Sequence, residues 1–368
     1  MTSSRTLRVL VGDDQPAVLS AVRLLLKSHG HSAVTADNPA AVLSHALQSS
    51  FDAILIDLNY ARDTTSGQEG IDLLRSLHEA GVETPVVVMT AWGSVGLAVE
   101  AMRQGACDFI EKPWSNADLL RVLSTRAEEG AARRIRQKRA RSEIEVAQTV
   151  QRRLLPEAHL RLNTLDYAAV CKPASEVGGD LYDYLRFSST KAGFVLADVS
   201  GKGVGAALLM AHLQASFRTL VAAGQDNPSA ICAEVNRLFH TATTLEQYAT
   251  VVFADYDDLT RELRYVNAGH LAPLLLRNDG SVERLHSTAT VLGMFDRWAC
   301  DSRVVRLDPG ETLVVFSDGL EEVPDDLLVR TALEHKGAPA GVAAEALVAL
   351  GVSAHQHDDI TVLVLRSL

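Results

Sequence analysis

Carboxylates recur in the C-terminal half of this sequence at the ends of apolar segments, where they could hold a metal ion. Asp198 follows the apolar run 194–197 and precedes a glycine-rich turn, after which a helical pattern begins. Three further acidic segments stand in similar settings and contain Asp180, Asp318, Asp358 and Asp359. Hard oxygen ligands without a neighbouring cluster of Cys or His favour Mg²⁺ or Mn²⁺ over zinc.

A second set of polar residues closes apolar strands predicted in the first 125 residues. The strands, at 8–11, 54–56, 86–89 and 108–110, alternate with helical patterns, which predicts an α/β domain with a doubly wound parallel sheet. Sites in such sheets lie beyond the carboxyl ends of the strands. The polar residues at those ends are Asp13, Asp14, Asp57, Thr90 and Lys112.

This ordered set resembles the receiver domain of two-component response regulators, over roughly residues 6–125. The resemblance implies that Asp57 accepts a phosphoryl group from a histidine kinase. It also implies a Mg²⁺ ion, which screens the repulsion between a carboxylate and an anionic phosphoryl group. The ligands of this ion would be Asp13, Asp14, Asp57 and the main-chain carbonyl of Asn59. Taken alone, an Asp pair at a strand end is more often a helix cap.

Three other receiver residues would respond to the phosphoryl group. Lys112 would offer a compact positive charge to a phosphate oxygen. The Thr90 hydroxyl would bond to the phosphate, and Phe109 would be the aromatic that rotates with this switch. The loop 58–70 is several residues longer than is usual in the family. We expect this loop to alter partner contacts and phosphate lifetime and to leave the phosphorylation chemistry intact.

The acidic segments of the C-terminal half, in their order, resemble metal-dependent type 2C (PPM) Ser/Thr protein phosphatases. More narrowly, they resemble the bacterial SpoIIE-like branch, over about residues 140–368. Shorter matching segments are Ala268-Gly-His-Leu-Ala-Pro273, Leu292-Gly-Met-Phe295 and Leu307-Asp-Pro-Gly310. The resemblance implies an α+β domain with a β-sandwich flanked by helices. The run of strand patterns with few crossover helices fits this fold.

The resemblance also implies two Mn²⁺ or Mg²⁺ ions, about 3.5–4 Å apart, that activate a water nucleophile. Asp198 would bridge the ions and the Val199 carbonyl would be a further ligand. Asp318 and Asp358 would complete one shell, Asp180 would serve the other ion through water, and Asp359 would support the ligands from behind. The residues that the resemblance assigns to this metal site are therefore Asp180, Asp198, Val199, Asp318, Asp358 and Asp359. His270 is open to two interpretations, a functional residue or a hydrogen-bonded structural histidine.

A helical linker is predicted over residues 126–156, and a coiled coil is one form that it could take. Seven basic and two acidic residues lie between Arg126 and Arg141, and Gly130 is the intrinsic weak point of the helix. Ile144, Ala147, Val150 and Leu154 then form a narrow apolar seam. Such a seam often pairs with its copy, which predicts a homodimer. The alternative is a helix that packs on its own phosphatase domain.

Length and composition fit two soluble domains, residues 1–125 and 157–368, on either side of this linker. The chain has 368 residues and a net charge of −11, which argues against nucleic acid as a partner. The four cysteines lack paired spacing, so we expect neither disulfides nor zinc. No apolar run suggests a membrane span and no secretory signal is present, which predicts a cytoplasmic protein without membrane contact.

Other outputs are weaker interpretations. Gly178-Gly-Asp-Leu-Tyr182 superficially resembles the motif of diguanylate cyclases, but Leu181 stands where that motif needs a second acid. A pseudo-phosphatase that recruits a partner is a further alternative, and a DNA-binding output is disfavoured. The preferred hypothesis is a response regulator with a Ser/Thr phosphatase output. Its substrate would be a regulatory phosphoprotein, an anti-sigma-factor antagonist.

Overall fold

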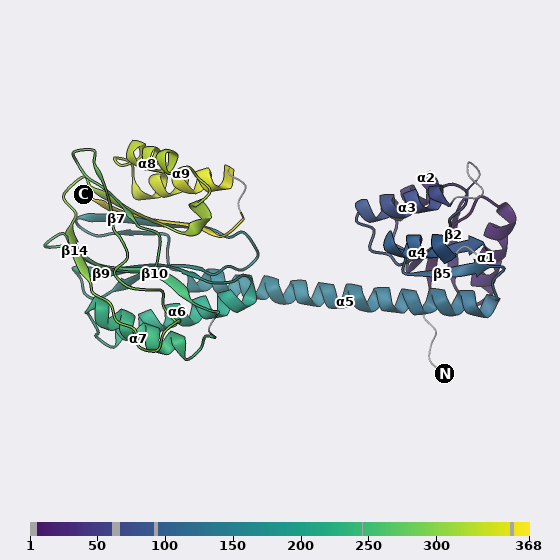
Figure 1. Ribbon diagram of the computed structural model, residues 1–368, viewed down its shortest axis with the longest axis horizontal. Coiled ribbons are helices and arrows are strands. Elements are labelled where there is room, and N and C mark those ends of the chain that lie inside the picture. The colour runs from purple at the N-terminus through teal and green to yellow at the C-terminus, as the bar shows by residue number, and fades with distance from the viewer. Residues whose placement is uncertain (1–5, 61–66, 92–94, 245, 354–356) are drawn as a thin grey trace. The chain divides into compact units, whose positions relative to one another are not determined.

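The computed structural model describes residues 6–60, 67–91, 95–244, 246–353 and 357–368. The chain divides into two compact units, Met1–Arg141 and Ser142–Leu368, each with its own buried core (Figure 1). The boundary falls within one continuous helix, α5 (Asn116–Leu154).

The first unit is built on a five-stranded parallel sheet with the order β2-β1-β3-β4-β5. Its strands are β1 (Arg8–Gly12), β2 (Ser32–Ala36), β3 (Ala53–Asp57), β4 (Val86–Ala91) and β5 (Asp108–Lys112). The four strands predicted from apolar runs are confirmed. The prediction missed β2, an edge strand whose positions are mostly only partly buried, so its sequence carries no apolar run.

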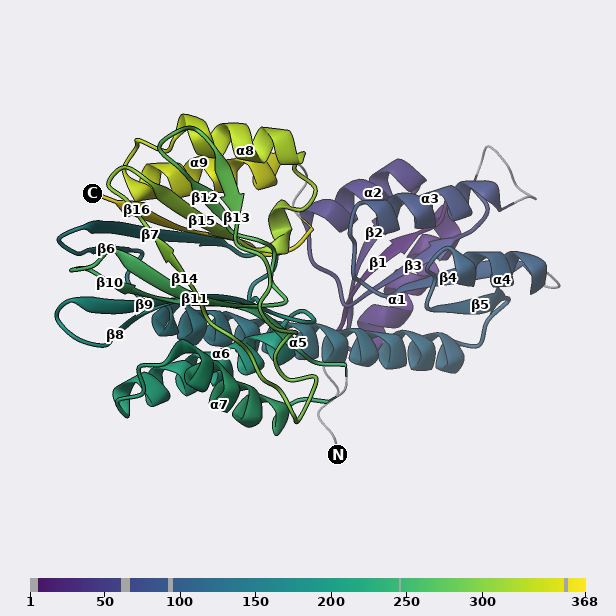
Figure 2. The same cartoon turned by 60° about the vertical axis from the view of Figure 1, so that its left-hand side comes forward.

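Helices cover both faces of this sheet, which explains why β3 is buried at every position. Side chains of α2 (Pro39–Gln48), α3 (Gln68–Glu79) and α4 (Val95–Arg103) share one core with the sheet. Those of α1 (Pro16–Ser28) and of the first turns of α5 share the other. Figure 2 shows α2 and α3 over one face and α1 and α5 over the opposite face. The predicted doubly wound fold is confirmed.

Gly130 proves to be a packing position of α5. It is buried against the ring of Pro85, and a Cβ atom added to Gly130 would overlap that ring. The glycine therefore lets α5 approach the parallel sheet of the first unit closely. The sequence-based interpretation of Gly130 as the intrinsic weak point of the helix stays a prediction beside this packing role.

We expect Gly130→Ala to lower the free energy of unfolding. Overpacking against Pro85 costs about 1–3 kcal/mol, which exceeds the gain of about 1 kcal/mol in helix propensity. Gly96→Ala is the matched control, because Gly96 also lies in a helix but an added Cβ would meet nothing within 4 Å. Urea denaturation should show a lower free energy of unfolding for Gly130→Ala and a higher one for Gly96→Ala. A higher free energy of unfolding in both variants would contradict the packing role.

The second unit is a sandwich of two antiparallel sheets, with the orders β14-β11-β10-β9-β8 and β13-β12-β15-β16-β7-β6. The strands are β6 (His159–Arg161), β7 (Leu165–Lys172), β8 (Asp180–Arg186), β9 (Lys191–Val199), β10 (Ala249–Asp257), β11 (Glu262–Ala268), β12 (Leu274–Leu276), β13 (Val282–Arg284), β14 (Arg303–Arg306), β15 (Thr312–Phe316) and β16 (Ile360–Ser367). The predicted sandwich is confirmed.

A pair of helices covers the outer face of each sheet, as Figure 1 shows. On the first sheet lie α6 (Val204–Ala222) and α7 (Pro228–His240), and on the second lie α8 (Asp325–Glu334) and α9 (Ala340–Ser353). Central strands are consequently buried on both faces. In β9, Val195 packs toward the helices and Phe194 packs between the sheets, which is why its sequence is a continuous apolar run.

Helix α6 qualifies the expectation that no segment could cross a membrane. Its 19 residues are long and apolar enough by length and composition alone. Met210, Leu213 and Phe217 of α6 nevertheless lie fully buried in the core beneath the first sheet. This packing accounts for the apolar residues on the buried side of α6, whereas Leu208 of the same helix is 68% exposed.

Candidate phosphorylation and metal sites

The receiver acids meet beyond the ends of β1 and β3, around one ammonium group. The Nζ atom of Lys112 lies 2.8 Å from Oδ2 of Asp13 and 2.8 Å from Oδ2 of Asp57. Both carboxylates are buried. Loss of hydration raises the pKa of Asp57 above its usual value, and the hydrogen bond from Lys112 opposes this shift.

This cluster fits a hard divalent cation. Asp13, Asp14 and Asp57 each offer a carboxylate oxygen, and the three oxygens lie within 4.8 Å of one another. The buried side-chain oxygen of Asn59 has no hydrogen-bond partner among the described residues, and the role of the Asn59 main-chain carbonyl as a ligand stays a prediction. Such an acid-rich group of oxygens is the ligand set that Mg²⁺ prefers.

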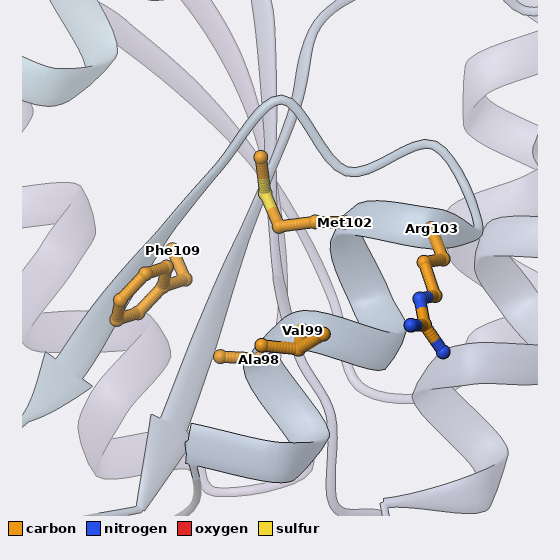
Figure 3. A pocket seen from close by; sticks show the side chains of 5 residues that line it. All are labelled: Ala98, Val99, Met102, Arg103 and Phe109. Atoms are coloured by element: carbon orange, nitrogen blue, oxygen red, sulfur yellow. The ribbon is translucent and has the colours of Figure 1, made fainter.

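The remaining receiver residues occupy the two C-terminal strands of the sheet. Thr90 is buried in β4. Phe109 in β5 is 47% exposed and lies in a surface pocket beside α4. Figure 3 shows this pocket, which is lined by Ala98, Val99, Met102, Arg103 and Phe109. The roles of Thr90 and Phe109 in a switch stay predictions.

The loop after Asp57 contains a buried tyrosine that the sequence analysis missed. Tyr60 is enclosed, and its hydroxyl has no hydrogen-bond partner among the described residues. Burial, and then the charge of Asp57, raises the pKa of this phenol above its usual range. A polar aromatic in a long loop gave no sequence signal of burial. Residues 61–66, the centre of the long loop, lie outside the described residues.

The phosphatase acids come from both sheets of the sandwich. Asp180 at the start of β8 lies directly opposite Asp198 near the end of β9. Asp318 opens a short 3₁₀ turn, Asp318–Leu320, after β15, and Asp358 precedes β16. Burial, together with the charges of Asp318, Asp358 and Asp359, raises the pKa of Asp198 to about 7. The structure therefore gathers these predicted residues around Asp198.

Burial and neighbouring charges also raise the pKa of Asp180 and Asp318. Burial, and then Asp198, raises the pKa of Asp180 well above its usual value, although the Thr361 hydroxyl donates a 2.6 Å hydrogen bond to its Oδ2 atom. Partial burial and Asp358 raise the pKa of Asp318. Carboxylates that raise one another's pKa repel one another when charged. Bound divalent ions would relieve this repulsion.

Close backbone approach also fits a metal site here. An added Cβ on Gly179 would lie 2.7 Å from the Val199 carbonyl oxygen, the predicted main-chain ligand.

The phosphatase acids are more widely spaced than those of the receiver. Among the described residues, only Asp13, Asp14 and Asp57 bring three ligand atoms within 4.8 Å.

Asp359 holds the glycine loop that precedes Asp180. Its Oδ2 atom accepts a 2.9 Å hydrogen bond from the Gly179 amide, and its Oδ1 atom accepts one of 2.8 Å from the Ala174 amide. An added Cβ on Gly178 would overlap this carboxylate. These contacts give Asp359 a supporting place behind the other acids.

His270 is enclosed by hydrogen bonds that fix its ring. Its Nε2–H group donates to the Phe316 carbonyl at 3.0 Å, and its Nδ1 atom lies 2.7 Å from the Thr250 hydroxyl. Burial lowers the pKa of His270 to about 4. The geometry favours the structural interpretation: the neutral ring ties the end of β15 to β10.

This burial makes His270 a source of acid sensitivity. Because the pKa of His270 is lowered from about 6.5 to about 4, the unfolded chain binds its proton more readily. Stability is therefore lost as the pH falls through this window, by about 3 kcal/mol at most. Denaturant unfolding at pH 7.5 and pH 5 should show a smaller pH-dependent loss for His270→Gln than for the wild type. An equal loss in both would contradict this assignment.

The last turn of α5 is hydrogen-bonded to the site. The Gln151 side-chain amide donates a 2.7 Å hydrogen bond to the Gly178 carbonyl. Its Oε1 atom accepts a 3.2 Å hydrogen bond from the Gly178 amide. The Leu154 carbonyl accepts from Gln214 and Arg218 of α6, at 2.8 and 3.2 Å. The helix end thus packs on its own phosphatase domain, the alternative that the sequence left open.

The predicted apolar seam is only partly covered in one chain. Ile144, Ala147 and Leu154 are half-buried, whereas the side chain of Val150 is 53% exposed. Val146, outside the predicted seam, is 62% exposed. Pairing of this helix with a second chain stays a prediction.

Comparisons with known proteins agree with both halves. A family model of the response regulator receiver domain matches residues 9–124, and one of Stage II sporulation protein E (SpoIIE) matches residues 188–367. The phosphoserine phosphatase RsbU of Bacillus subtilis is 29% identical over 187 residues, which cover 50% of this chain and 55% of RsbU. The transcriptional regulatory protein FixJ of Azorhizobium caulinodans is 37% identical over 140 residues, covering 38% of this chain and 63% of FixJ.

A solved structure supports the fold of the second unit. The SiaA-PP2C domain of Pseudomonas aeruginosa is 24% identical, with a TM-score of 0.54, and the match covers 62% of this chain and 98% of that domain. The chain spans about half the length of RsbU.

Proposed function

Because this chain joins an N-terminal receiver domain to a C-terminal SpoIIE-type PP2C phosphatase domain, we propose that it is a response regulator with protein phosphatase output. The proposed reaction is metal-dependent hydrolysis of phosphoserine or phosphothreonine in a protein. The observation that carries it is the convergence of Asp318 and Asp358 on Asp198, with Asp180 directly opposite.

We infer that the residues of this site would hold two ions together. Bound Mn²⁺ or Mg²⁺ supplies a water of lowered pKa and neutralises charge on the phosphoryl group. Asp198, which is paired with Asp180 across β8 and β9 and feels the charges of Asp318 and Asp358, would hold both ions, and the other three acids would complete their shells. The Val199 carbonyl, in close contact with Gly179, would add a main-chain ligand. Asp359 keeps the Gly178–Gly179 backbone in place.

The receiver would take its phosphoryl group on Asp57 from a histidine kinase. A carboxylate and an anionic phosphoryl group repel each other. The attack therefore needs positive charge beside the oxygens of both groups. Lys112 already lies 2.8 Å from Asp57, and Asp13 and Asp14 would hold the Mg²⁺ ion. The ion pairs with Lys112 keep the carboxylate oriented before phosphorylation.

We assign the substrate by class. An anti-sigma-factor antagonist fits the SpoIIE-like character of the domain and its similarity to a phosphoserine phosphatase. We also propose residues 1–125 as receiver, 126–156 as linker and 157–368 as phosphatase domain, in a cytoplasmic homodimer that pairs through the linker.

The test is phosphate release from a phosphoserine protein by the full chain. Hydrolysis that requires Mn²⁺ and stops on chelation supports the proposal. Binding of the phosphoprotein without hydrolysis, at any Mn²⁺ concentration, would instead identify a pseudo-phosphatase.

A further inference from the structure

Lys202 is a cation at the rim of the phosphatase acids. It stands in the turn between β9 and α6, and its side chain is 65% exposed. Its Nζ atom lies 2.9 Å from Oδ2 of Asp358 and donates a 2.9 Å hydrogen bond to the His357 carbonyl. The charge of Lys202 also opposes the upward shifts in the pKa of Asp198 and Asp318.

The turn leaves this side chain free to change partners. Gly201 and Gly203 flank Lys202, and both have positive φ, at 97° and 74°. An added Cβ on either glycine would meet nothing within 4 Å, so the turn is open around the lysine. A long, exposed side chain in such a turn can exchange one anionic partner for another within hydrogen-bond reach.

The charge balance of the site indicates which anion could replace Asp358 as the partner of Lys202. Asp180, Asp198, Asp318 and Asp358 together would balance two divalent ions, so a phosphoryl dianion would enter a site with no net positive charge. An ion that binds Asp358 also neutralises the carboxylate that now holds Lys202. The ammonium would then be available beside the bound ions, where the substrate phosphate must lie.

We propose that Lys202 binds the phosphoryl group of the substrate and, before metal binds, occupies Asp358 in place of the ion. This inference rests on the proposed phosphatase function. It assigns substrate phosphate recognition to a residue of the β9–α6 turn. It also makes Lys202 a competitor of the metal at Asp358.

The test compares Lys202→Met, which keeps length and removes charge, with Lys202→Arg. Lys191→Met is the matched control, because Lys191 also pairs with a carboxylate, Asp255 at 2.8 Å, but lies at the other end of β9. For a phosphoserine peptide we expect KM to rise about tenfold in Lys202→Met, with a smaller change in kcat. Lys202→Arg should retain most of the wild-type KM, and Lys191→Met should match the wild type.

Two binding measurements separate this inference from the phosphatase function itself. By calorimetry on the Mn²⁺-loaded chain, inorganic phosphate should bind about tenfold more weakly to Lys202→Met, whether or not the protein turns over a peptide. Without phosphate, Mn²⁺ should bind Lys202→Met more tightly than the wild type. Unchanged phosphate affinity would overturn phosphate recognition by Lys202, and unchanged or weaker Mn²⁺ affinity would overturn the competition.

Discussion

Asp198→Asn should remove nearly all metal-dependent phosphatase activity, by about three orders of magnitude or more. Asp198 is the residue on which the charges of Asp318 and Asp358 converge, and it lies opposite Asp180. An amide offers one neutral oxygen where the site needs a carboxylate shared between two cations. Phosphate release from a phosphoserine peptide at saturating Mn²⁺ measures the effect.

The same substitution should not weaken the metal-free fold. The pKa of Asp198 is raised from about 3.8 to about 7, so its charge destabilises the folded state as the pH rises through that interval. Asn carries no charge, and metal-free Asp198→Asn should be the more stable protein above pH 7. Asp301→Asn, at an exposed acid, is the control for both measurements. Full activity of Asp198→Asn would falsify the two-metal assignment.

Asp57→Ala should abolish phosphorylation of the receiver. An acyl-phosphate donor with Mg²⁺ should add one acid-stable, base-labile phosphoryl group to the wild-type chain. The buried Asp57 carboxylate, beside Lys112 and the acids that would hold Mg²⁺, is the acceptor that the geometry supports. Mass spectrometry would locate the group. Asp37→Ala, at an exposed acid, should keep the label, and a label that persists in Asp57→Ala would refute the assignment.

Sequence patterns succeeded where burial on both faces leaves a continuous apolar run. Such runs predicted β3 and β9, and with them the positions of Asp57 and Asp198. The sequence patterns assign no strand to β8, because this strand begins with a buried acid, Asp180, and contains a second, Asp183. They likewise assign no helix to α9, which is rich in alanine and apolar around its circumference and so leaves no helical periodicity.

Contacts between distant segments could not be predicted from local sequence. The pairing of Gln151 with Gly178 joins residues 27 positions apart, and nothing about an exposed glutamine on a helix indicates it. Lys202 likewise stands in a glycine-rich turn whose fold alone brings it to Asp358, far along the chain. The resemblance supplied the identity of the acids, and the structure supplied their neighbours.

Gln151 offers a physical route between the two functions. It lies on the helix that begins after β5 of the receiver and ends on the glycine loop before Asp180. A displacement of this helix would move the Gly178 backbone and, through it, the site. A coupling free energy of about 1–3 kcal/mol would change activity several-fold to about a hundredfold.

The most direct test of receiver control is the dephosphorylation rate of the full chain with and without an acyl-phosphate donor. We expect the donor to change the rate several-fold or more in the wild type, to leave Asp57→Ala unchanged, and to have a smaller effect in Gln151→Ala. Equal rates with and without donor in the wild type, or the same change in Asp57→Ala, would contradict control of the phosphatase by phosphorylation of Asp57.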